Sequence, residues 1–551
     1  MLLKNGATDQ KLRGGYYTPK PLADSIVKLF IDDVNEGNIK SVLEPSAGDG
    51  IFIKSIQNYL NLDKIDNITA VELLEEEAEK IKKITHNDNT FNVMNTDFME
   101  FYDQVALKEK YDLIIGNPPY IRYQYLTEEQ RLLQAKVLQE NGMKPNKLIN
   151  AWVYFLVAAV SLLNENGKIA FVIPADLLQV AYAQDLRLFL TNNLSKITII
   201  AFEELLFEGV EQEVVVFIGE KEVGNNTSDA MIGMVEYKNL LDVGNLDLRG
   251  IEYQLAEHSK EKWTKYFISK TDMDLIRDLK EHSKFVSFND IGVVNVGITT
   301  GNNGYFSVNE EIVEKYSLQN VVLPLIGRSS HAHGIYFTDE DWKKNIDAKK
   351  NSFLIKFPDD MTYEEYPDIH KKYIELGESN GENLGYKCRI RDRWYIVPSV
   401  WVPDAFFLRR NNVFPKFVIN NIDAVSTDTM HRIKFYEGID KDKALLSYYN
   451  SITFAFTEIN GRSYGGGVLE ILPGEVGKVI LPNLQAMDET KVKYLLNQID
   501  KTIRNDLPID DLLDEIDKEV LVGHLGIAPS IVERFRNIWK LLMTRRLTRS
   551  K

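Results

Sequence analysis

The sequence of 551 residues predicts an α/β protein with three parts: a Rossmann-like, doubly wound sheet, a mixed α+β domain, and a helical C-terminal region. Strand-like and helix-like segments alternate up to about residue 220, as a doubly wound sheet requires. After about residue 260, short β-like pieces are separated by Gly-Asn and Pro turns, as in residues 297–304. Charged helical patterns return from Leu484 and continue to Leu547.

The elements follow in chain order. A helix is expected from Pro21 to Phe30, and strands are expected at 41–45, 68–72, 91–94, 111–116, 168–173, 197–203 and 213–219. The apolar run Ala151 to Leu163 has 13 residues, too few to span a bilayer, and predicts a core helix. The polar stretch before it, from Tyr120, is interpreted as a partly helical loop that could order over a substrate. The expected domains are 1–240, 260–482 and 483–551, with a polar break at 225–229.

A rigid loop follows the strand at 111–116. Its sequence is Asn117-Pro118-Pro119-Tyr120. Neither proline donates a backbone N–H, and each restrains the preceding residue to extended geometry. The amide and the carbonyls can accept hydrogen bonds from an exocyclic NH₂, while the tyrosine ring can stack on a flat base. The loop therefore suits an amino group on a heterocycle.

A second loop, between the strand at 41–45 and the next helix, indicates a bound cofactor. It is rich in small residues and contains Glu44, Pro45, Ser46, Ala47, Gly48, Asp49 and Gly50. Glycines permit positive φ and close backbone approach. Such a turn in an open α/β sheet marks a ligand crevice. The dinucleotide fingerprint G-x-G-x-x-G is absent.

Two acidic residues complete this pattern. Glu72 ends the strand at 68–72, 22 residues after Gly50, where such folds bind a ribose diol. Asp97 and Phe98 follow the next strand and pair a carboxylate acceptor with an aromatic ring. Taken alone, Glu72 would more often be a solvated helix cap, and Asp97 an ordinary N-cap. Their order and spacing favour the joint interpretation.

The motif order resembles that of S-adenosylmethionine-dependent DNA adenine-N6 methyltransferases of the gamma group. The N-terminal motif of that group corresponds to Gly14-Gly15-Tyr16-Tyr17-Thr18-Pro19. The resemblance is close from Gly14 to Gly219 and looser to about Pro482. It implies a Rossmann-like methyltransferase fold, S-adenosyl-L-methionine as cofactor, no metal, and double-stranded DNA as substrate.

The resemblance also implies a role for each motif residue. Tyr17, Thr18, Pro19 and the loop from Glu44 to Gly50 would surround the methionine end of the cofactor. Glu72 would bind the ribose, Asp97 the amino group of the cofactor adenine, and Phe98 the face of that adenine. Asn117 and the Pro118 carbonyl would accept the protons of the target amino group. Tyr120 and Phe207 would stack on the flipped target base.

The expected chemistry is direct methyl transfer. Two acceptors on the amino hydrogens of adenine favour localisation of its nitrogen lone pair toward the methyl group. The sulfonium methyl is already activated, so transfer needs positioning more than acid–base catalysis. Oriented acceptor dipoles meet the positive charge that develops on nitrogen. A base inside a duplex is out of reach and must be flipped out.

Composition agrees with an enzyme of the bacterial or phage cytoplasm. The single cysteine, Cys388, excludes an intrachain disulfide, and no Cys/His cluster has zinc spacing. The N-terminus lacks the apolar core of a signal peptide. The net charge of −16 argues against nonspecific coating of DNA but leaves local DNA binding open.

A basic and aromatic region predicts the DNA contacts. Between Tyr386 and Lys434 there are nine Lys or Arg residues against four Asp residues. Cations among aromatic residues fit phosphate contact and base-edge reading. A solvated β-surface, or a flexible hairpin tip at 461–467, would be the simpler explanation. The candidate DNA-binding residues are Arg389, Arg391, Arg393, Arg409, Arg410, Arg462 and Tyr464.

Three other functions stay open. A fused restriction–modification enzyme is disfavoured because no Pro-Asp…Glu/Asp-x-Lys constellation precedes the cofactor motif, although a restriction endonuclease on a separate chain is compatible. Protein glutamine and RNA amino-methyltransferases also use this loop but rarely need a basic, aromatic C-terminal half. A DNA-binding module with an inactive pocket is disfavoured because every expected motif residue is present. By resemblance, the chain should act on a short, asymmetric duplex site as a monomer without membrane contact.

Overall fold

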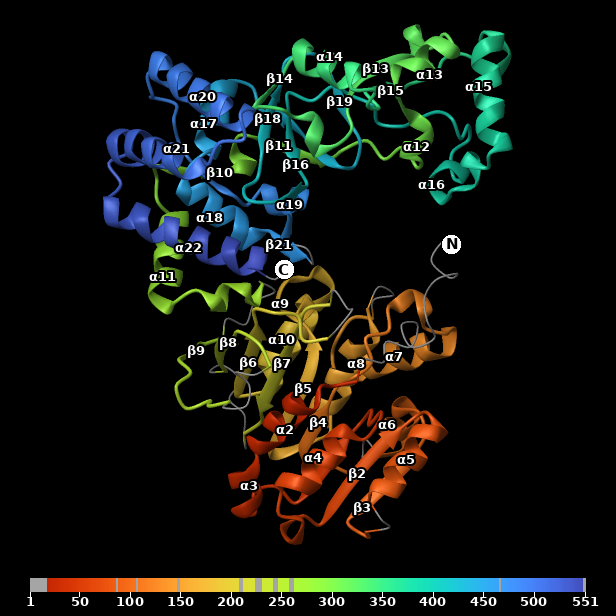
Figure 1. The fold of residues 1–551 in the computed structure, drawn as a ribbon, viewed down its shortest axis with the longest axis vertical. Helices are drawn as coiled ribbons and strands as arrows, with labels where there is room; N and C mark the ends of the chain where they lie inside the picture. The colour runs from red at the N-terminus through yellow and green to blue at the C-terminus, as the bar shows by residue number, and fades with distance from the viewer. Residues whose placement is uncertain are drawn as a thin grey trace. The chain divides into compact units, whose positions relative to one another are not determined.

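The computed structural model describes residues 17–85, 88–105, 108–145, 149–207, 212–222, 230–240, 246–256, 262–464 and 467–548. The chain divides into two units between Lys270 and Thr271 (Figure 1). The polar break at 225–229 and the first three residues of the N-terminal motif, Gly14 to Tyr16, lie outside the described residues. The first unit extends beyond the expected boundary at 240, and the helices expected at 483–551 lie in the same unit as the residues before them.

A nine-stranded sheet organises the first unit. Its strand order is β3-β2-β1-β4-β5-β7-β6-β8-β9. The strands from β3 to β5 are parallel, and β7 runs antiparallel to both of its neighbours. The strands are β1 (Ser41–Glu44), β2 (Asn67–Glu72), β3 (Phe91–Asn95), β4 (Tyr111–Gly116), β5 (Leu163–Pro174), β6 (Lys196–Phe202), β7 (Val214–Glu220), β8 (Met231–Tyr237) and β9 (Tyr253–Leu255). The predicted Rossmann-like sheet is confirmed.

The strand order places the site. Strands β2 and β3 lie on one side of β1, while β4 and β5 lie on the other, so the order reverses between β1 and β4. In open α/β sheets, ligands bind beyond the carboxyl ends of the strands at such a switch point. The four loops with candidate site residues all leave the sheet at these carboxyl ends.

Helices connect these strands. They are α2 (Lys20–Lys28), α3 (Ile31–Asn35), α4 (Ile51–Tyr59), α5 (Glu75–Thr85), α6 (Phe98–Val105), α7 (Glu128–Glu140), α8 (Ala151–Ser161), α9 (Asp176–Gln179) and α10 (Gln184–Asn193). Helix α8 is apolar all round and buried, as its sequence predicts. The described residues contain no helix that is both long and apolar enough to cross a bilayer.

The polar stretch after Tyr120 is more ordered than expected. It forms a short 3₁₀ turn at Tyr123–Tyr125 and then the 13-residue helix α7. Thr127 and Gln130 start this helix with a reciprocal capping box, in which each side chain accepts from the backbone N–H of the other. The sequence predicted a partly helical loop, and Thr127 and Gln130 mark where its helix begins.

The second unit combines small sheets with helices. Its helices are α11 (Lys270–Lys280), α12 (Asn303–Phe306), α13 (Glu310–Lys315), α14 (Asp339–Asp347), α15 (Asp368–Ser379), α16 (Tyr386–Arg389), α17 (Lys441–Tyr448), α18 (Ser451–Asn460), α19 (Pro473–Val476), α20 (Glu489–Arg504), α21 (Ile509–Ile516) and α22 (Pro529–Thr548). A π-helical segment, Asp517–His524, follows α21.

The strands of this unit form four sheets. The five-stranded sheet contains β11 (Gly292–Val296), β20 (Met430–Phe435), β16 (Ala405–Leu408), β18 (Phe417–Asn420) and β14 (Tyr336–Phe337). The four-stranded sheet contains β12 (Ser307–Val308), β15 (Phe353–Ile355), β13 (Val322–Ile326) and β19 (Val425–Ser426). The two smaller sheets contain β10 (Phe285–Ser287) with β23 (Ile480–Pro482), and β17 (Arg410–Asn411) with β22 (Val468–Glu470) and β21 (Arg462–Tyr464).

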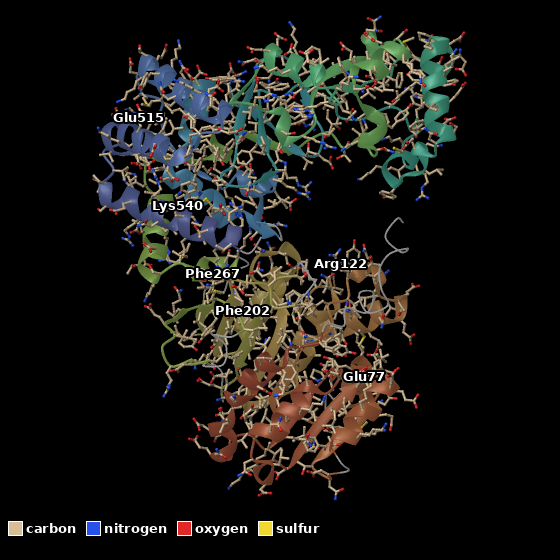
Figure 2. The ribbon with its side chains drawn as sticks, viewed as in Figure 1. Glu77, Arg122, Phe202, Phe267, Glu515 and Lys540 are labelled. Atoms are coloured by element: carbon tan, nitrogen blue, oxygen red, sulfur yellow. The ribbon has the colours of Figure 1, made fainter. Side chains whose placement is uncertain are left out.

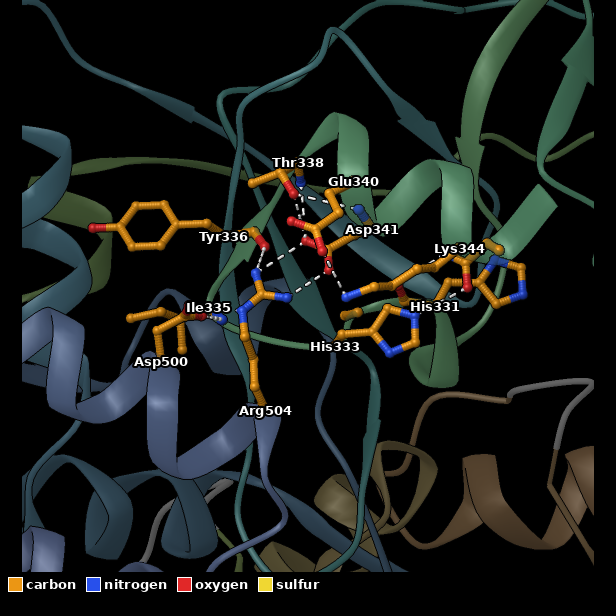
Figure 3. Close-up of polar contacts among 12 residues, drawn as sticks. His331, His333, Ile335, Tyr336, Thr338, Glu340, Asp341, Lys344, Asp500 and Arg504 are labelled. Carbon is orange, nitrogen blue, oxygen red and sulfur yellow. Dashed lines mark hydrogen bonds and ion pairs between the residues drawn. The ribbon is translucent and has the colours of Figure 1, made fainter. Parts of the chain in front are cut away.

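A buried polar network joins α20 to the start of α14 (Figure 3). The Arg504 guanidinium binds both carboxylate oxygens of fully buried Asp341, at 2.5 and 3.0 Å, and also binds Asp500 at 2.7 Å. Asp341 in turn accepts from the backbone N–H and hydroxyl of Thr338. Bidentate pairs of this kind fix geometry. The network therefore holds the helical C-terminal part against the sheets of the same unit.

Candidate functional site

A cavity of about 740 Å³ lies at the carboxyl ends of β1, β2, β3 and β4. It brings together residues from all four predicted loops and the N-terminal motif. The predicted site residues in its wall are Tyr17, Thr18, Glu44, Pro45, Ser46, Ala47, Gly48, Asp49, Glu72, Asp97, Phe98, Asn117 and Pro119. Pro19, Gly50, Pro118, Tyr120 and Phe207 are not part of the wall.

The glycine loop after β1 is held in a tight turn. Gly48 and Gly50 have φ values of +53° and +76°, which favour glycine. The backbone N–H of Gly48 donates to the Glu72 carboxylate at 2.8 Å, and the N–H of Ala47 donates to Val71 O. Gly50 then precedes helix α4 directly. These bonds fix the loop backbone against the neighbouring strand β2.

Glu72 is anchored by its backbone donors. Its two carboxylate oxygens accept from the N–H groups of Gly48 and Leu74, both at 2.8 Å. Burial raises the pKa of Glu72, and these backbone donors oppose that shift because they stabilise the ionised form. The result is an oriented carboxylate in the cavity wall.

Glu44 is a buried carboxylate in the same wall. It is 1% exposed, and within the described part of the chain its Oε2 has no hydrogen-bond partner. Burial raises the pKa of Glu44 well above its usual range, and the carboxylates of Asp49 and Glu72 raise it further. A buried carboxylate is costly unless a cation or donor meets it. The wall is therefore suited to a ligand that carries positive charge.

Asp97 and Phe98 begin helix α6. The Asp97 carboxylate caps this helix by accepting from Met99 N at 2.8 Å, and burial raises its pKa. Only one of its oxygens, Oδ1, makes that bond. The Phe98 ring stacks on Phe155 of α8, with centroids 4.9 Å apart and planes at 19°. The ordinary N-cap explanation for Asp97 therefore holds, and the residue lines the cavity as well.

The proline loop after β4 is held at its first residue. Asn117 Nδ2 donates to Thr18 Oγ1 at 3.1 Å, and Asn117 O accepts from the Ser46 hydroxyl at 3.2 Å. Thr18 is itself buried, with 6% exposure. Since Nδ2 faces Thr18, the amide oxygen Oδ1 points away from Thr18 within the same amide plane. The N-terminal motif thus orients the side-chain amide of Asn117, and the glycine loop holds its backbone carbonyl.

The two predicted stacking residues are buried. Tyr120 is 9% exposed, and its hydroxyl donates to Val172 O on β5 at 3.0 Å. Phe207 is 6% exposed and belongs to the hydrophobic core of the first unit. The structure holds the Tyr120 ring firmly but does not present either ring to the cavity. Their stacking roles stay predictions.

Several wall residues were not among the predicted site residues. Leu73 and Leu74 follow β2 and are 60% and 39% exposed, which leaves apolar surface open beside the cavity. A sequence signal existed, because these residues come directly after the predicted ribose ligand. Others come from the segment around α7 and from α8, whose positions depend on tertiary packing. They are Ile121, Tyr125, Leu126, Gln130, Ala151, Tyr154 and Phe155.

Hydroxyl and carboxylate groups also order the edge of the cavity. Tyr17 is 48% exposed, and its hydroxyl donates at 3.2 Å to Glu77 of α5. Glu77 is labelled in Figure 2. A Cβ atom at Gly48 would lie 3.6 Å from the Tyr17 ring, so the ring lies over the glycine loop.

Among the described residues, no group of three His, Cys, Asp or Glu side chains could hold a metal ion.

Most of the predicted DNA-binding arginines have partners within the protein. Arg391 donates to Thr299 O and Trp394 O, and Arg393 donates to Met361 O and Asp359 O. These two guanidinium groups brace loops, and their DNA-binding role stays a prediction. Tyr386–Arg389 forms a helical turn and not the solvated β-surface offered as the simpler explanation. Arg389 is exposed.

The remaining arginines form ion pairs. Arg409 and Arg410 both contact Glu470, at 2.9 and 3.5 Å, and Arg410 is still 72% exposed. Arg462 contacts Glu475 at 2.9 Å, and both side chains are 14% exposed. Arg462 is therefore less accessible than a flexible hairpin tip would make it. The side chain of Tyr464 lies outside the described residues.

Comparisons with known proteins agree with this geometry. Residues 42–207 match the Eco57I restriction-modification methylase family, and residues 260–521 match the C-terminal domain family of Type II methyltransferase M.Eco57I. Type II methyltransferase M.AccI of Acinetobacter calcoaceticus is 25% identical over 534 residues, covering 91% of this chain and 92% of the relative. M.HindII of Haemophilus influenzae is 28% identical over 368 residues, covering 63% and 65%.

A solved structure supports the fold. The Type IIL restriction-modification enzyme MmeI, determined in complex with DNA, aligns over 95% of this chain and 75% of its own. The TM-score is 0.55 at 12% sequence identity. At this identity the likeness concerns the fold alone.

Proposed function

We propose that this chain, which is similar to Type II restriction-modification methyltransferases, is a site-specific DNA adenine-N6 methyltransferase. It would transfer a methyl group from S-adenosyl-L-methionine to the amino group of an adenine flipped out of duplex DNA. The observation that carries the proposal is the orientation of Asn117 by Thr18 at the edge of a cavity lined with carboxylates.

The cavity wall fits the cofactor. S-adenosylmethionine carries a sulfonium and an ammonium group, and the buried Glu44 carboxylate needs such a charge. Glu72 would hold the ribose, and Asp97 has one carboxylate oxygen that does not cap α6 and could accept from the adenine amino group. Leu73, Leu74 and Phe98 would cover the faces of the adenine. Bound there, S-adenosylmethionine supplies an activated methyl group.

The chain's own residues would position the target. Asn117 Oδ1 and the Pro118 carbonyl would accept the two amino hydrogens of adenine, which favours the lone pair toward the methyl group. Their dipoles are fixed before the reaction, so they stabilise the charge that develops on nitrogen without reorganisation. Tyr120, anchored to Val172, would support the flipped base. No acid–base residue is needed for an in-line transfer of this kind.

Modification sequencing tests the whole proposal. Long-read sequencing would be applied to DNA from cells that express the wild-type chain, Asn117→Ala, or the control Asn38→Ala. Asn38 is a matched control because its amide contacts Glu36 outside the cavity. We expect N6-methyladenine at one fixed motif in the wild type and the control, and none in Asn117→Ala. Absence of modified adenine in all three would point to an RNA or protein substrate.

A further inference from the structure

Three large apolar side chains project from one corner of the second unit. Leu384, Tyr386 and Ile390 are 71%, 65% and 58% exposed, and all three lie within a stretch of seven residues. They belong to the 3₁₀ turn Glu382–Leu384, to helix α16 and to the residue that follows it. Figure 1 shows α16 beside α12 and α15. Together with Lys387 and Arg389, we call these residues the α16 tip.

The base of the α16 tip is firmly packed. Cys388 is fully buried between the exposed residues and lies 3.9 Å from Thr300 O. A Cβ atom at Gly301 would lie only 2.9 Å from Cys388 Sγ, so the two backbones approach closely. Arg391 donates to Thr299 O at 3.0 Å, and Asn302 bonds Glu382. The apolar side chains are therefore exposed on a braced support.

The α16 tip is also locally basic. Residues 384–393 contain four Lys or Arg residues and one Asp in a chain with a net charge of −16. Lys387 and Arg389 are exposed and, with the residues that the structure describes, form no ion pair. Lys387 Nζ lies 5.9 Å from the centre of the Tyr386 ring. Cations thus flank the apolar side chains at their rim.

We propose that the α16 tip enters a groove of duplex DNA, an inference that rests on the proposed function. A groove presents polar base edges between two rows of phosphates, and an apolar side chain can leave water there by inserting between the faces of successive bases. Leu384, Tyr386 and Ile390 would insert between base steps, and Lys387 and Arg389 would contact the phosphates at the rim. Apolar wedges of this kind insert between base steps in proteins that deform DNA.

The test separates apolar insertion from phosphate contact. Anisotropy would measure the affinity of the full chain for a duplex carrying the modified motif, at several salt concentrations. The apolar variant is Leu384→Ala/Tyr386→Ala/Ile390→Ala, and the charge variant is Lys387→Gln/Arg389→Gln. The control is Tyr494→Ala/Leu507→Ala, whose side chains are 53% and 52% exposed in the same unit. Tyr494 contacts Glu515, whose negative charge is unsuited to DNA. Glu515 is labelled in Figure 2.

We expect the apolar variant to bind the duplex about tenfold to a hundredfold more weakly, with an unchanged salt dependence. The charge variant should reduce the slope of log K against log salt by about 1.8, because two phosphate contacts are lost. The control should remain within about twofold of the wild type. All variants should keep the wild-type melting temperature to within a few degrees, because the replaced side chains are mainly exposed.

Each contrary result has a distinct meaning. If the wild type methylates the duplex and the apolar variant binds like the control, the α16 tip does not enter DNA. An unchanged salt slope in the charge variant overturns the phosphate contacts. A change in sedimentation of the apolar variant without loss of DNA affinity would assign the tip to contact between copies of the chain. If the wild type neither binds nor methylates duplex DNA, the proposed function itself fails.

Discussion

Replacing Thr18 with valine should slow methyl transfer, because it removes the acceptor that orients Asn117. Thr18 Oγ1 accepts from Asn117 Nδ2 at 3.1 Å, and Thr18 is 6% exposed, so water has little access to take its place. Valine keeps nearly the same volume but cannot accept a hydrogen bond. The perturbation is therefore chemical and leaves the packing of the N-terminal motif almost unchanged.

The magnitude follows from the lost bond. A buried donor that loses its acceptor costs about 1–3 kcal/mol. The Asn117 amide can avoid this cost by turning over, but it then presents hydrogens where the proposed reaction needs an acceptor. Either way the transition state should be destabilised by a similar amount. A change of about 1–3 kcal/mol corresponds to roughly a 5-fold to 150-fold lower rate.

Single-turnover methylation of a duplex carrying the modified motif measures this rate, and calorimetry measures the affinity for S-adenosylmethionine. Thr18→Ser is the matched control because it keeps Oγ1, and it should transfer methyl groups within about threefold of the wild type. The affinity for S-adenosylmethionine should stay within about threefold of the wild type in both variants. A valine variant as fast as the serine variant would refute the positioning role of Thr18.

Further predictions concern stability and pH. Arg546→Met should lower the free energy of unfolding by about 3–5 kcal/mol in urea titrations, because the Glu458 carboxylate, 3% exposed and 2.6 Å from Arg546, is left buried without its cation. Adding Glu458→Gln should recover most of that loss. In urea titrations, Gly50→Ala should lower the free energy of unfolding by at least about 1 kcal/mol more than the control Gly37→Ala. Both glycines have strongly positive φ, but only a Cβ at Gly50 would crowd two isoleucine side chains, at 3.1 and 3.2 Å. Burial raises the pKa of Glu44 in the folded state, so the protonated carboxyl is the form that the fold favours. The contribution of Glu44 to the free energy of unfolding is therefore fully present below about pH 4.5 and is lost as pH rises through the folded pKa. Glu44→Gln should therefore gain more stability at pH 8 than at pH 5 in denaturant titrations. The cationic cofactor favours the ionised carboxylate, so the wild-type affinity for S-adenosylmethionine should rise with pH, a trend that calorimetry should find reduced in Glu44→Gln.

Local sequence signals were sufficient for seven strands of the nine-stranded sheet and for the loops at its edge, whereas β8 and β9 were not predicted. Parallel strands that are buried on both faces appear as short continuous apolar runs, so β1, β2 and β4 were predicted to within a residue or two. The residues that end these strands were identified from the residue types that follow each run. Since parallel strands place their carboxyl ends at one edge, the convergence of Glu44, Glu72 and Asn117 on one cavity followed from the order of motifs.

The partners of the charged residues in the second unit could not be predicted from the sequence. Arg391 and Arg393 have the same local appearance as Arg389, but the first two donate to backbone carbonyls of distant loops. Arg546 is 2% exposed and bound to Glu458, 88 residues earlier. A cation's availability depends on partners that lie far away in the sequence.

By itself, the sequence determined the order of the first seven strands along the chain, the tight glycine turn, and the proline loop after β4, because each depends on the properties of a few consecutive residues. Only the tertiary structure decided which side chains complete the cavity wall, how Thr18 orients Asn117, and which cations stay exposed. These features depend on contacts between segments that are far apart in the sequence, such as the contacts of Thr18 with Asn117 and of Thr299 with Arg391, which span 99 and 92 residues. Such contacts are set by the packing of the whole unit.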